Sequence, residues 1–160
     1  MTANTIQLFI QDLIKYIDDR FAKDERISSS KKLNGCLAFN DKLIENANKS
    51  FYVVQCLSNS MRDETFNSSL TKQVSIQIDI FAIKGTFNKV QYLAEPMSIV
   101  LQDVVSQYMT DLKFGNYNNN ICLMREITAS PALSYRDGSK AYTASLRYDF
   151  TIMADYTPVI

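Results

Sequence analysis

Residues 73–84 alternate between apolar and polar side chains, and this pattern constrains the fold more than any other feature of the chain. One side of the extended segment carries only apolar residues: Val74, Ile76, Ile78, Ile80 and Ala82. The other side carries Ser75, Gln77, Asp79 and Phe81. A period of two predicts a β-strand. At roughly 3.3 Å per residue it exceeds about 30 Å in length, so a long apolar face needs a cover.

A second segment, residues 141–156, has the same alternation and supplies another long strand with one apolar face. Two amphipathic segments can cover such faces. Residues 6–23 place apolar side chains at helical spacing, with Gln11, Asp12, Lys15, Asp18 and Asp19 turned away. Residues 88–112 predict a second helix, capped by Asn88, in which Pro96 is expected to introduce a kink near Tyr92.

The remaining strands complete the element order. Residues 51–57 and 121–128 read as strands that form hairpins with the two long ones. Residues 58–72 are expected to form a long hairpin loop, and residues 24–50 an irregular polar segment. The order α-β-β-α-β-β predicts an α+β sandwich, a mostly antiparallel sheet with two helices packed on one face. We expect a single domain over residues 1–160.

Composition narrows the function classes. The formal net charge is zero over 160 residues, which argues against partners bound by charge alone, such as duplex DNA or an anionic membrane. Cys36, Cys56 and Cys122 are scattered, a pattern that suits a reducing compartment better than a disulfide framework. The N-terminal segment does not resemble a signal peptide, and no apolar run approaches the ~20 residues of a membrane span. The expected product is soluble and intracellular.

The sequence contains few of the residue patterns that indicate catalysis. It contains no histidine, which removes the most common general base and transition-metal ligand, and its four glycines are isolated. We therefore predict no enzymatic activity, no cofactor and no metal site. Two acidic pairs, Asp18-Asp19 and Asp63-Glu64, are interpreted as a solvated helix face and as surface or partner contact, respectively.

Asp79 is expected to point away from the core face of its strand. We expect it to pair across the sheet with Arg147 or Lys140 rather than to act as an acid or base. The polar face that it shares with Ser145, Arg147 and neighbouring residues forms a surface suited to contact. The tyrosines of the last hairpin favour an interface or sheet packing about equally: Tyr135, Tyr142, Tyr148 and Tyr156. A long open sheet needs protected edges, and closure into a ring is one solution.

Three segments together resemble a known family. These are the amphipathic helix at residues 5–23, the strand Val-Ser-Ile-Gln-Ile-Asp-Ile-Phe-Ala at 74–82, and the strand Leu-Arg-Tyr-Asp-Phe-Thr-Ile at 146–152, which follows Ser-Pro and Asp-Gly turn signals. The chain resembles the tail terminator (tail-completion) proteins of tailed bacteriophages. It departs from them in the extra polar segment at 24–50 and in the proline of the second helix.

The resemblance implies a virion protein of the tail or neck, assembled in the cytoplasm of the bacterial host. It implies a hexameric homo-oligomeric ring that caps the head-proximal end of the tail tube, stops tube growth and joins the tube to the neck. The implied partners are the tail tube protein and a neck or head-completion protein, with DNA passing through the ring lumen without sequence-specific recognition and with no membrane partner.

The resemblance also assigns contact residues. The first hairpin tip would face a neighbouring subunit or the tube through Arg62, Asp63, Glu64 and Phe66. The second hairpin tip would make inter-subunit or neck contacts through Tyr135, Arg136 and Asp137. Two alternatives stay open. One is another head–tail connector, neck or tail-tube component. The other is a small soluble α+β module that binds a small molecule or peptide.

Overall fold

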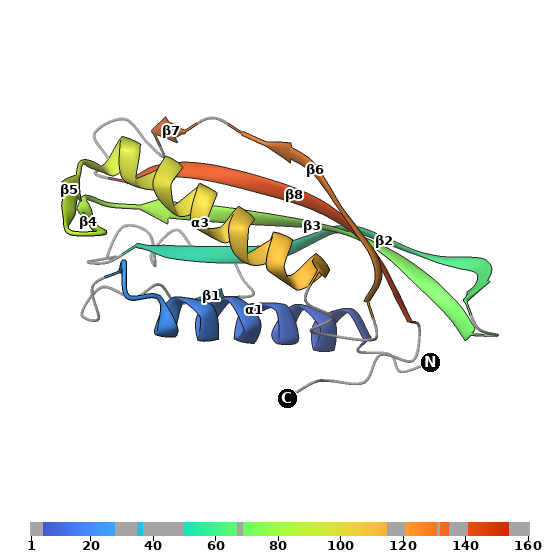
Figure 1. Cartoon of the computed structure of the whole chain (residues 1–160). Helices are drawn as coiled ribbons and strands as arrows, with labels where there is room; N and C mark the ends of the chain where they lie inside the picture. The colour runs from blue at the N-terminus through green and yellow to red at the C-terminus, as the bar shows by residue number, and fades with distance from the viewer. Residues whose placement is uncertain are drawn as a thin grey trace.

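The core of the molecule is one twisted sheet in which four long strands run antiparallel to their neighbours (Figure 1). The computed structural model describes residues 5–27, 35–36, 50–66, 69–114, 121–130, 132–134 and 141–153. The long strands lie in the order β2 (Phe51–Phe66), β3 (Ser69–Ala82), β8 (Tyr142–Met153) and β6 (Ile121–Ala129). Two short strands extend this sheet: β1 (Gly35–Cys36), parallel to β2, and β7 (Leu133–Ser134), antiparallel to β8.

The register of β3 against β8 places apolar side chains opposite one another on the inner face. Ile78 lies opposite Leu146, and Ile80 lies opposite Ala144. All four of these side chains are at most 1% exposed. The alternation in both strands therefore produces a single continuous apolar face, as the sequence predicts.

Two helices cover this inner face, α1 (Thr5–Lys23) and α3 (Ala94–Phe114) (Figure 1). Their buried side chains join those of the sheet in one core cluster, and Phe9 of α1 meets Phe150 of β8 edge to face at 4.9 Å. Full burial of such a side chain stabilises the fold by about 1.5–3 kcal/mol. The α+β fold, with the order α-β-β-α-β-β among its long elements, is thus confirmed.

The prediction of a long loop at residues 58–72 is wrong. β2 continues to Phe66 and β3 starts at Ser69, so residues 67–68 alone connect them. The pairing holds from Phe51 opposite Phe81 out to Phe66 opposite Ser69, with two register shifts on the way. The polar composition of residues 58–66 resembles that of a loop, but their pairing with β3 shows that they continue β2.

The second helix also begins later than predicted. Residues 85–92 form a hairpin of β4 (Gly85–Phe87) and β5 (Val90–Tyr92), and Asn88 lies in its turn instead of capping a helix. Asn88 and Lys89 have φ values of 50° and 67°, which is the left-handed pair that a two-residue type I′ turn requires. Pro96 therefore falls in the first turn of α3, where backbone N–H groups lack intrahelical acceptors, and its missing N–H breaks no hydrogen bond.

Of the carboxylates on helix α1 that the sequence pattern turned outward, one is buried and another is half-buried. Asp12 is 3% exposed, and Asp18 accepts a hydrogen bond of 2.7 Å from the Tyr52 hydroxyl of β2. Tyr16 is also buried on this helix and donates its hydroxyl hydrogen to the carbonyl oxygen of Tyr108 at 2.5 Å. The solvated-face interpretation therefore holds for Asp19, whose exposed carboxylate pairs with Lys15, but not for Asp18.

Candidate interaction surface

The outer face of the sheet, away from the helices, carries a connected polar network centred on Asp79. Its carboxylate is almost inaccessible, because Asp79 is only 6% exposed. It accepts hydrogen bonds from the amide nitrogens of Gln55 at 2.5 Å and Gln77 at 2.8 Å, and another from the hydroxyl of Ser145. Three strands, β2, β3 and β8, therefore meet at one buried carboxylate.

The network reaches the surface at Arg147. Because the Gln77 amide nitrogen faces Asp79, its carbonyl oxygen faces the other way and accepts a hydrogen bond from Arg147 at 2.9 Å. The predicted direct pairing of Asp79 with Arg147 is therefore wrong: register places Asp79 opposite Ser145 and Arg147 opposite Gln77. Lys140, the other predicted partner, lies outside the described residues. The Gln77 amide therefore connects the exposed Arg147 guanidinium to the buried Asp79 carboxylate.

A second arginine lies next to the first on the same face. Arg125 of β6 is opposite Asp149 of β8, and their charged groups are 3.6 Å apart. Asp149 is itself fixed by the Ser75 hydroxyl, which donates to it at 2.7 Å. Arg125 is a diagonal neighbour of Arg147, a relation that separates two residues by roughly 7–8 Å in a sheet. The Arg125 side chain is 77% exposed and Asp149 is 42% exposed, so the accessible charge here is predominantly positive.

Exposed aliphatic side chains lie on the same side of the sheet, and Leu123 is the one beside Arg125. Leu123 of β6 is 60% exposed and Leu133 of β7 is 62% exposed, and their registers with Thr151 and Thr143 place both on the outer face. Ile127, at a register shift in β6, is 39% exposed. β6 hydrogen bonds to β8 on one side, and no other described strand pairs with its far edge. An exposed edge flanked by apolar groups is a typical contact surface.

The opposite end of the outer face is apolar and covered. Phe51 of β2 and Phe81 of β3 lie opposite each other and stack with ring centroids 5.1 Å apart. Together with Val53 they form a second, small cluster in which Phe81 is 3% exposed. Among the described residues, Arg125, Arg147 and Leu123 thus place exposed polar and apolar groups together at the β6 side of the outer face.

The first set of predicted contact residues lies at the far end of the β2–β3 hairpin. Arg62 is opposite Thr71, and Phe66 is opposite Ser69; Asp63 and Glu64 fall between, where the register shifts. β8 pairs with β3 only as far as Thr71, so the hairpin tip projects past its neighbour and past both helices (Figure 1). The second predicted set, Tyr135, Arg136 and Asp137, lies outside the described residues.

The tyrosines of the last strand divide between core and surface. Tyr148 is 1% exposed and belongs to the main core cluster, so it is a packing residue. Burial raises the pKa of its hydroxyl well above the ordinary value, and the nearby Glu126 carboxylate acts in the same direction. Tyr142 is half-buried beside β7. Tyr135 and Tyr156 lie outside the described residues.

A charged cluster on the helical side joins the end of α1 to α3, and the sequence pattern gave no sign of it. The Arg26 guanidinium donates two hydrogen bonds, 2.9 and 2.8 Å long, to the Asp24 carboxylate. It also lies over the Phe87 ring. The Tyr108 hydroxyl of α3 also donates to Asp24. The Arg26 contact is the main cause that lowers the pKa of Asp24 to about 2, and burial raises the pKa of Tyr108. This cluster fixes the position of the β4–β5 hairpin.

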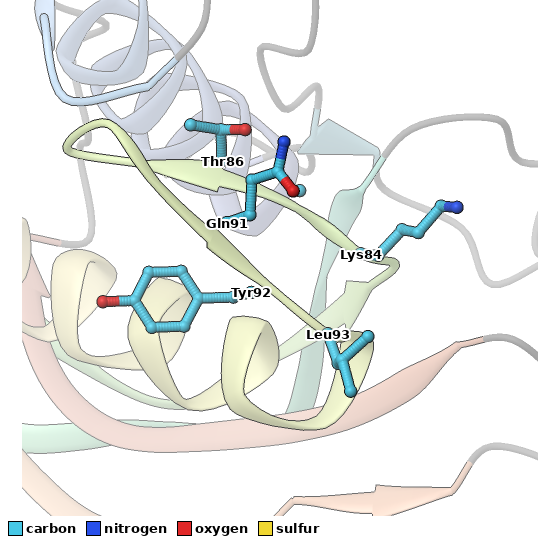
Figure 2. Close-up of a pocket in the computed structure, with 6 residues that line it drawn as sticks. Lys84, Thr86, Gln91, Tyr92 and Leu93 are labelled. Atoms are coloured by element: carbon cyan, nitrogen blue, oxygen red, sulfur yellow. The ribbon is translucent and has the colours of Figure 1, made fainter.

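A surface pocket of about 370 Å³ lies at the base of that hairpin. It is lined by Lys84, Gly85, Thr86, Gln91, Tyr92 and Leu93. Figure 2 shows that the side chains diverge: Lys84 and Tyr92 point to opposite sides, while Thr86 and Gln91 lie together on a third. Polar groups that do not converge on one point make a poor ligand site. The outer sheet face is therefore the stronger candidate for function.

No protein-family model matches the chain, and no curated protein matches it. Within the described ranges, no group of three or more acidic or cysteine side chains is arranged to hold a metal ion. No helix in that part of the chain is both long and apolar enough to cross a bilayer.

Proposed function

We propose that the chain is a structural subunit that assembles head to tail into a ring and acts as a tail terminator of a tailed bacteriophage. In this role the ring, a hexamer, caps the head-proximal end of the tail tube, stops its polymerisation and joins it to the neck. The role requires no covalent chemistry and no cofactor. The assignment to a phage tail is based on the resemblance of residues 74–82 and 146–152 to that family.

The observation that carries the ring proposal is the distribution of contact surfaces on one sheet. The β2–β3 hairpin projects at one corner, and β6 presents an edge that no described strand covers. Both helices pack on the inner face (Figure 1), and the outer face carries the exposed Arg125 and Arg147. Two different patches on one chain favour a head-to-tail contact, and such a contact closes into a ring when its rotation permits.

Electron microscopy of the purified protein tests the proposal. We expect negatively stained class averages at high protein concentration to contain six-fold rings with a central hole of tube-like width. Grids prepared with assembled tail tubes should show one end decorated. Particles that remain monomers, both alone and with tubes, would argue against the ring and the terminator role together.

The same grids separate the closest alternative. Another tail-tube or neck component would stack into longer tubes or bind at both tube ends, whereas a terminator decorates one end and prevents extension. Rings that bind no tube end would retain the ring-forming subunit but remove the terminator assignment.

A further inference from the structure

Strand β6 forms one edge of the main sheet (Figure 1). It pairs with β8 on one side, and no other described strand pairs with its other side. Alternate residues of an edge strand direct their backbone N–H and C=O groups away from the sheet, where an added strand can pair with them. The opposite edge differs, because β1 pairs there with Tyr52 and Val53 of β2. β6 is therefore the edge that is better placed to accept a further strand.

Two consecutive residues of β6 carry opposite charges on opposite faces of this edge. Arg125 lies opposite Asp149 on the outer face, and its side chain is 77% exposed. Glu126 lies opposite the core residue Tyr148 on the helix side and is exposed. It accepts a hydrogen bond of 3.4 Å from the Ser106 hydroxyl of α3. A strand added here therefore meets a positive group on one face and, at the next residue, a negative group on the other.

The Arg125 guanidinium has room for a second carboxylate besides that of Asp149. The charged groups of this pair are 3.6 Å apart, which is longer than a hydrogen bond of about 2.7–3.2 Å. A guanidinium carries several N–H donors in a planar fork, so donors remain for a carboxylate on the open side. Leu123, the preceding residue on the same face, is 60% exposed and offers an apolar contact. The outer face of the edge thus suits an acidic and an apolar side chain in alternation.

A second β6 strand complements this pattern poorly. If two β6 strands paired antiparallel about a twofold axis at Arg125, the two arginines would lie opposite each other. An axis at Glu126 would place the two glutamates opposite each other in the same way. Like charges that are directly opposite destabilise a strand pair. The charges of β6 therefore favour an occupant with a different sequence.

We propose that the β6 edge binds an extended segment of a partner protein, added antiparallel as a further strand of the sheet. The segment places a basic side chain against Glu126, a carboxylate against Arg125 and an apolar side chain against Leu123. From its N-terminus it therefore has the order basic, acidic, any residue, apolar. Its backbone hydrogen bonds supply affinity, and its side chains supply specificity. This partner is not a second copy, and its binding does not require a ring.

A synthetic peptide with this order tests the site: Thr-Val-Thr-Lys-Glu-Thr-Leu-Thr-Val, with a fluorophore at its N-terminus. Fluorescence anisotropy measures its binding to the full chain. The peptide of reversed sequence has the same composition and should bind about tenfold more weakly, because its charges then meet like charges. The variant Arg125→Glu with Glu126→Lys exchanges two exposed side chains. It should bind the original peptide about tenfold more weakly and prefer the peptide in which Lys and Glu are exchanged.

Strand addition also has a backbone signature. N-methylation of alternate peptide residues removes N–H groups from one side of the peptide only. Methylation of the set that faces β6 should abolish binding, whereas methylation of the other set should preserve it. Amide hydrogen exchange of the protein should slow in β6 when the peptide binds and stay unchanged in β2, the other edge strand.

Several results would overturn this inference: no binding up to the solubility limit of the peptide, equal binding of the original and reversed peptides, or tolerance of both methylation patterns. A second copy at the edge would overturn it as well. Sedimentation velocity would then show a self-associated protein that Arg125→Glu with Glu126→Lys dissociates, and its β6 amides would be protected without peptide. That result would support the ring and exclude the partner segment. A protein that binds the peptide but stays monomeric, even with tail tubes, would support the segment and argue against the ring.

Discussion

The hydroxyl of Ser145 donates a hydrogen bond to the carboxylate of Asp79, and this contact joins the two central strands on the face opposite the helices. The same carboxylate accepts the amide groups of Gln55 and Gln77. The three donors satisfy the hydrogen-bonding capacity of the buried Asp79 carboxylate. Without that carboxylate, the same donors would be left partly buried without an acceptor, which costs free energy of folding. Asp79 therefore acts as a structural anchor for the outer face, and Arg147 is its link to solvent.

Replacement of Asp79 by alanine should destabilise the protein. Three donors would lose their acceptor, and because they are partly buried we expect a cost of about 1–3 kcal/mol in the free energy of unfolding. Urea unfolding of the wild type and variant measures this cost. Asp149→Ala is the matched control: its carboxylate is 42% exposed, so its loss should change stability by no more than about 0.5 kcal/mol. Equal effects of the two substitutions would contradict the anchor role.

The Asp24–Arg26 contact should appear as a pH-dependent contribution to stability. The folded-state pKa of Asp24 is about 2, below the ordinary value of about 3.9 for an unfolded chain. A lowered pKa means that the contribution is present above about pH 4 and is lost as the pH falls towards about 2. Asp24→Asn should therefore lower the free energy of unfolding by about 1–2 kcal/mol near pH 7, after allowance for the partial exposure of Arg26.

Urea titrations between about pH 7 and pH 2 check this window, because the gap between wild type and Asp24→Asn should close at the acid end. Asp19→Asn provides the control. Its partner Lys15 is one turn away on α1, and both side chains are about half exposed. That surface pair should contribute no more than about 0.5 kcal/mol at any pH. A gap for Asp24→Asn that persists unchanged at low pH would show that its cause is packing rather than charge.

The sequence predicts the inner half of the fold well and the outer half poorly. Alternation in residues 73–84 and 141–156 encodes which side chains enter the core, since one face of each strand is wholly apolar. Residues 58–66 carry no such signal, and their polar composition resembles that of a loop. The alternation places Asp79 on the correct face, but two of its three hydrogen-bond partners come from β2 and β8 and depend on register. No local pattern encodes that register.

The β4–β5 turn gave a similar error. Asn-Lys is a weaker turn signal than Asn-Gly, and Val90 and Leu93 fit a helical spacing with the residues that follow, so the sequence predicts a helix from Asn88. Lys89 nevertheless has a φ of 67°, a conformation that costs an L-residue with a side chain roughly 1 kcal/mol. The turn is maintained by its surroundings, including the hydrogen bond from the Asn88 backbone N–H to the Arg26 carbonyl at 2.7 Å.

Lys89→Gly should consequently stabilise the protein. Glycine adopts positive φ without steric cost, and Asn-Gly is a preferred type I′ pair, so we expect a gain of up to about 1 kcal/mol and a higher melting temperature. Lys72→Gly, in the interior of β3, is the control and should lose about 0.5–1 kcal/mol, because glycine weakens an element interior. A loss of stability for both variants would mean that the Lys89 side chain makes a contribution greater than its backbone strain.

The register of the central strand can be tested by a single buried charge. Ile78 is 0% exposed and lies opposite Leu146 beneath the helices. An unpaired carboxylate at that position costs several kcal/mol, which is a large part of the total stability of a domain, so Ile78→Asp should abolish soluble expression. Ile127→Asp makes the same change on β6, where the side chain is 39% exposed, and should fold normally. Circular dichroism and thermal melting of the soluble fractions distinguish the two.

Because a shift of one residue exchanges the two faces of a strand, a well-folded Ile78→Asp protein with an ordinary melting transition would place residue 78 on the outer face. Asp79 would then lie in the core, and the anchor of the outer network would be lost with it.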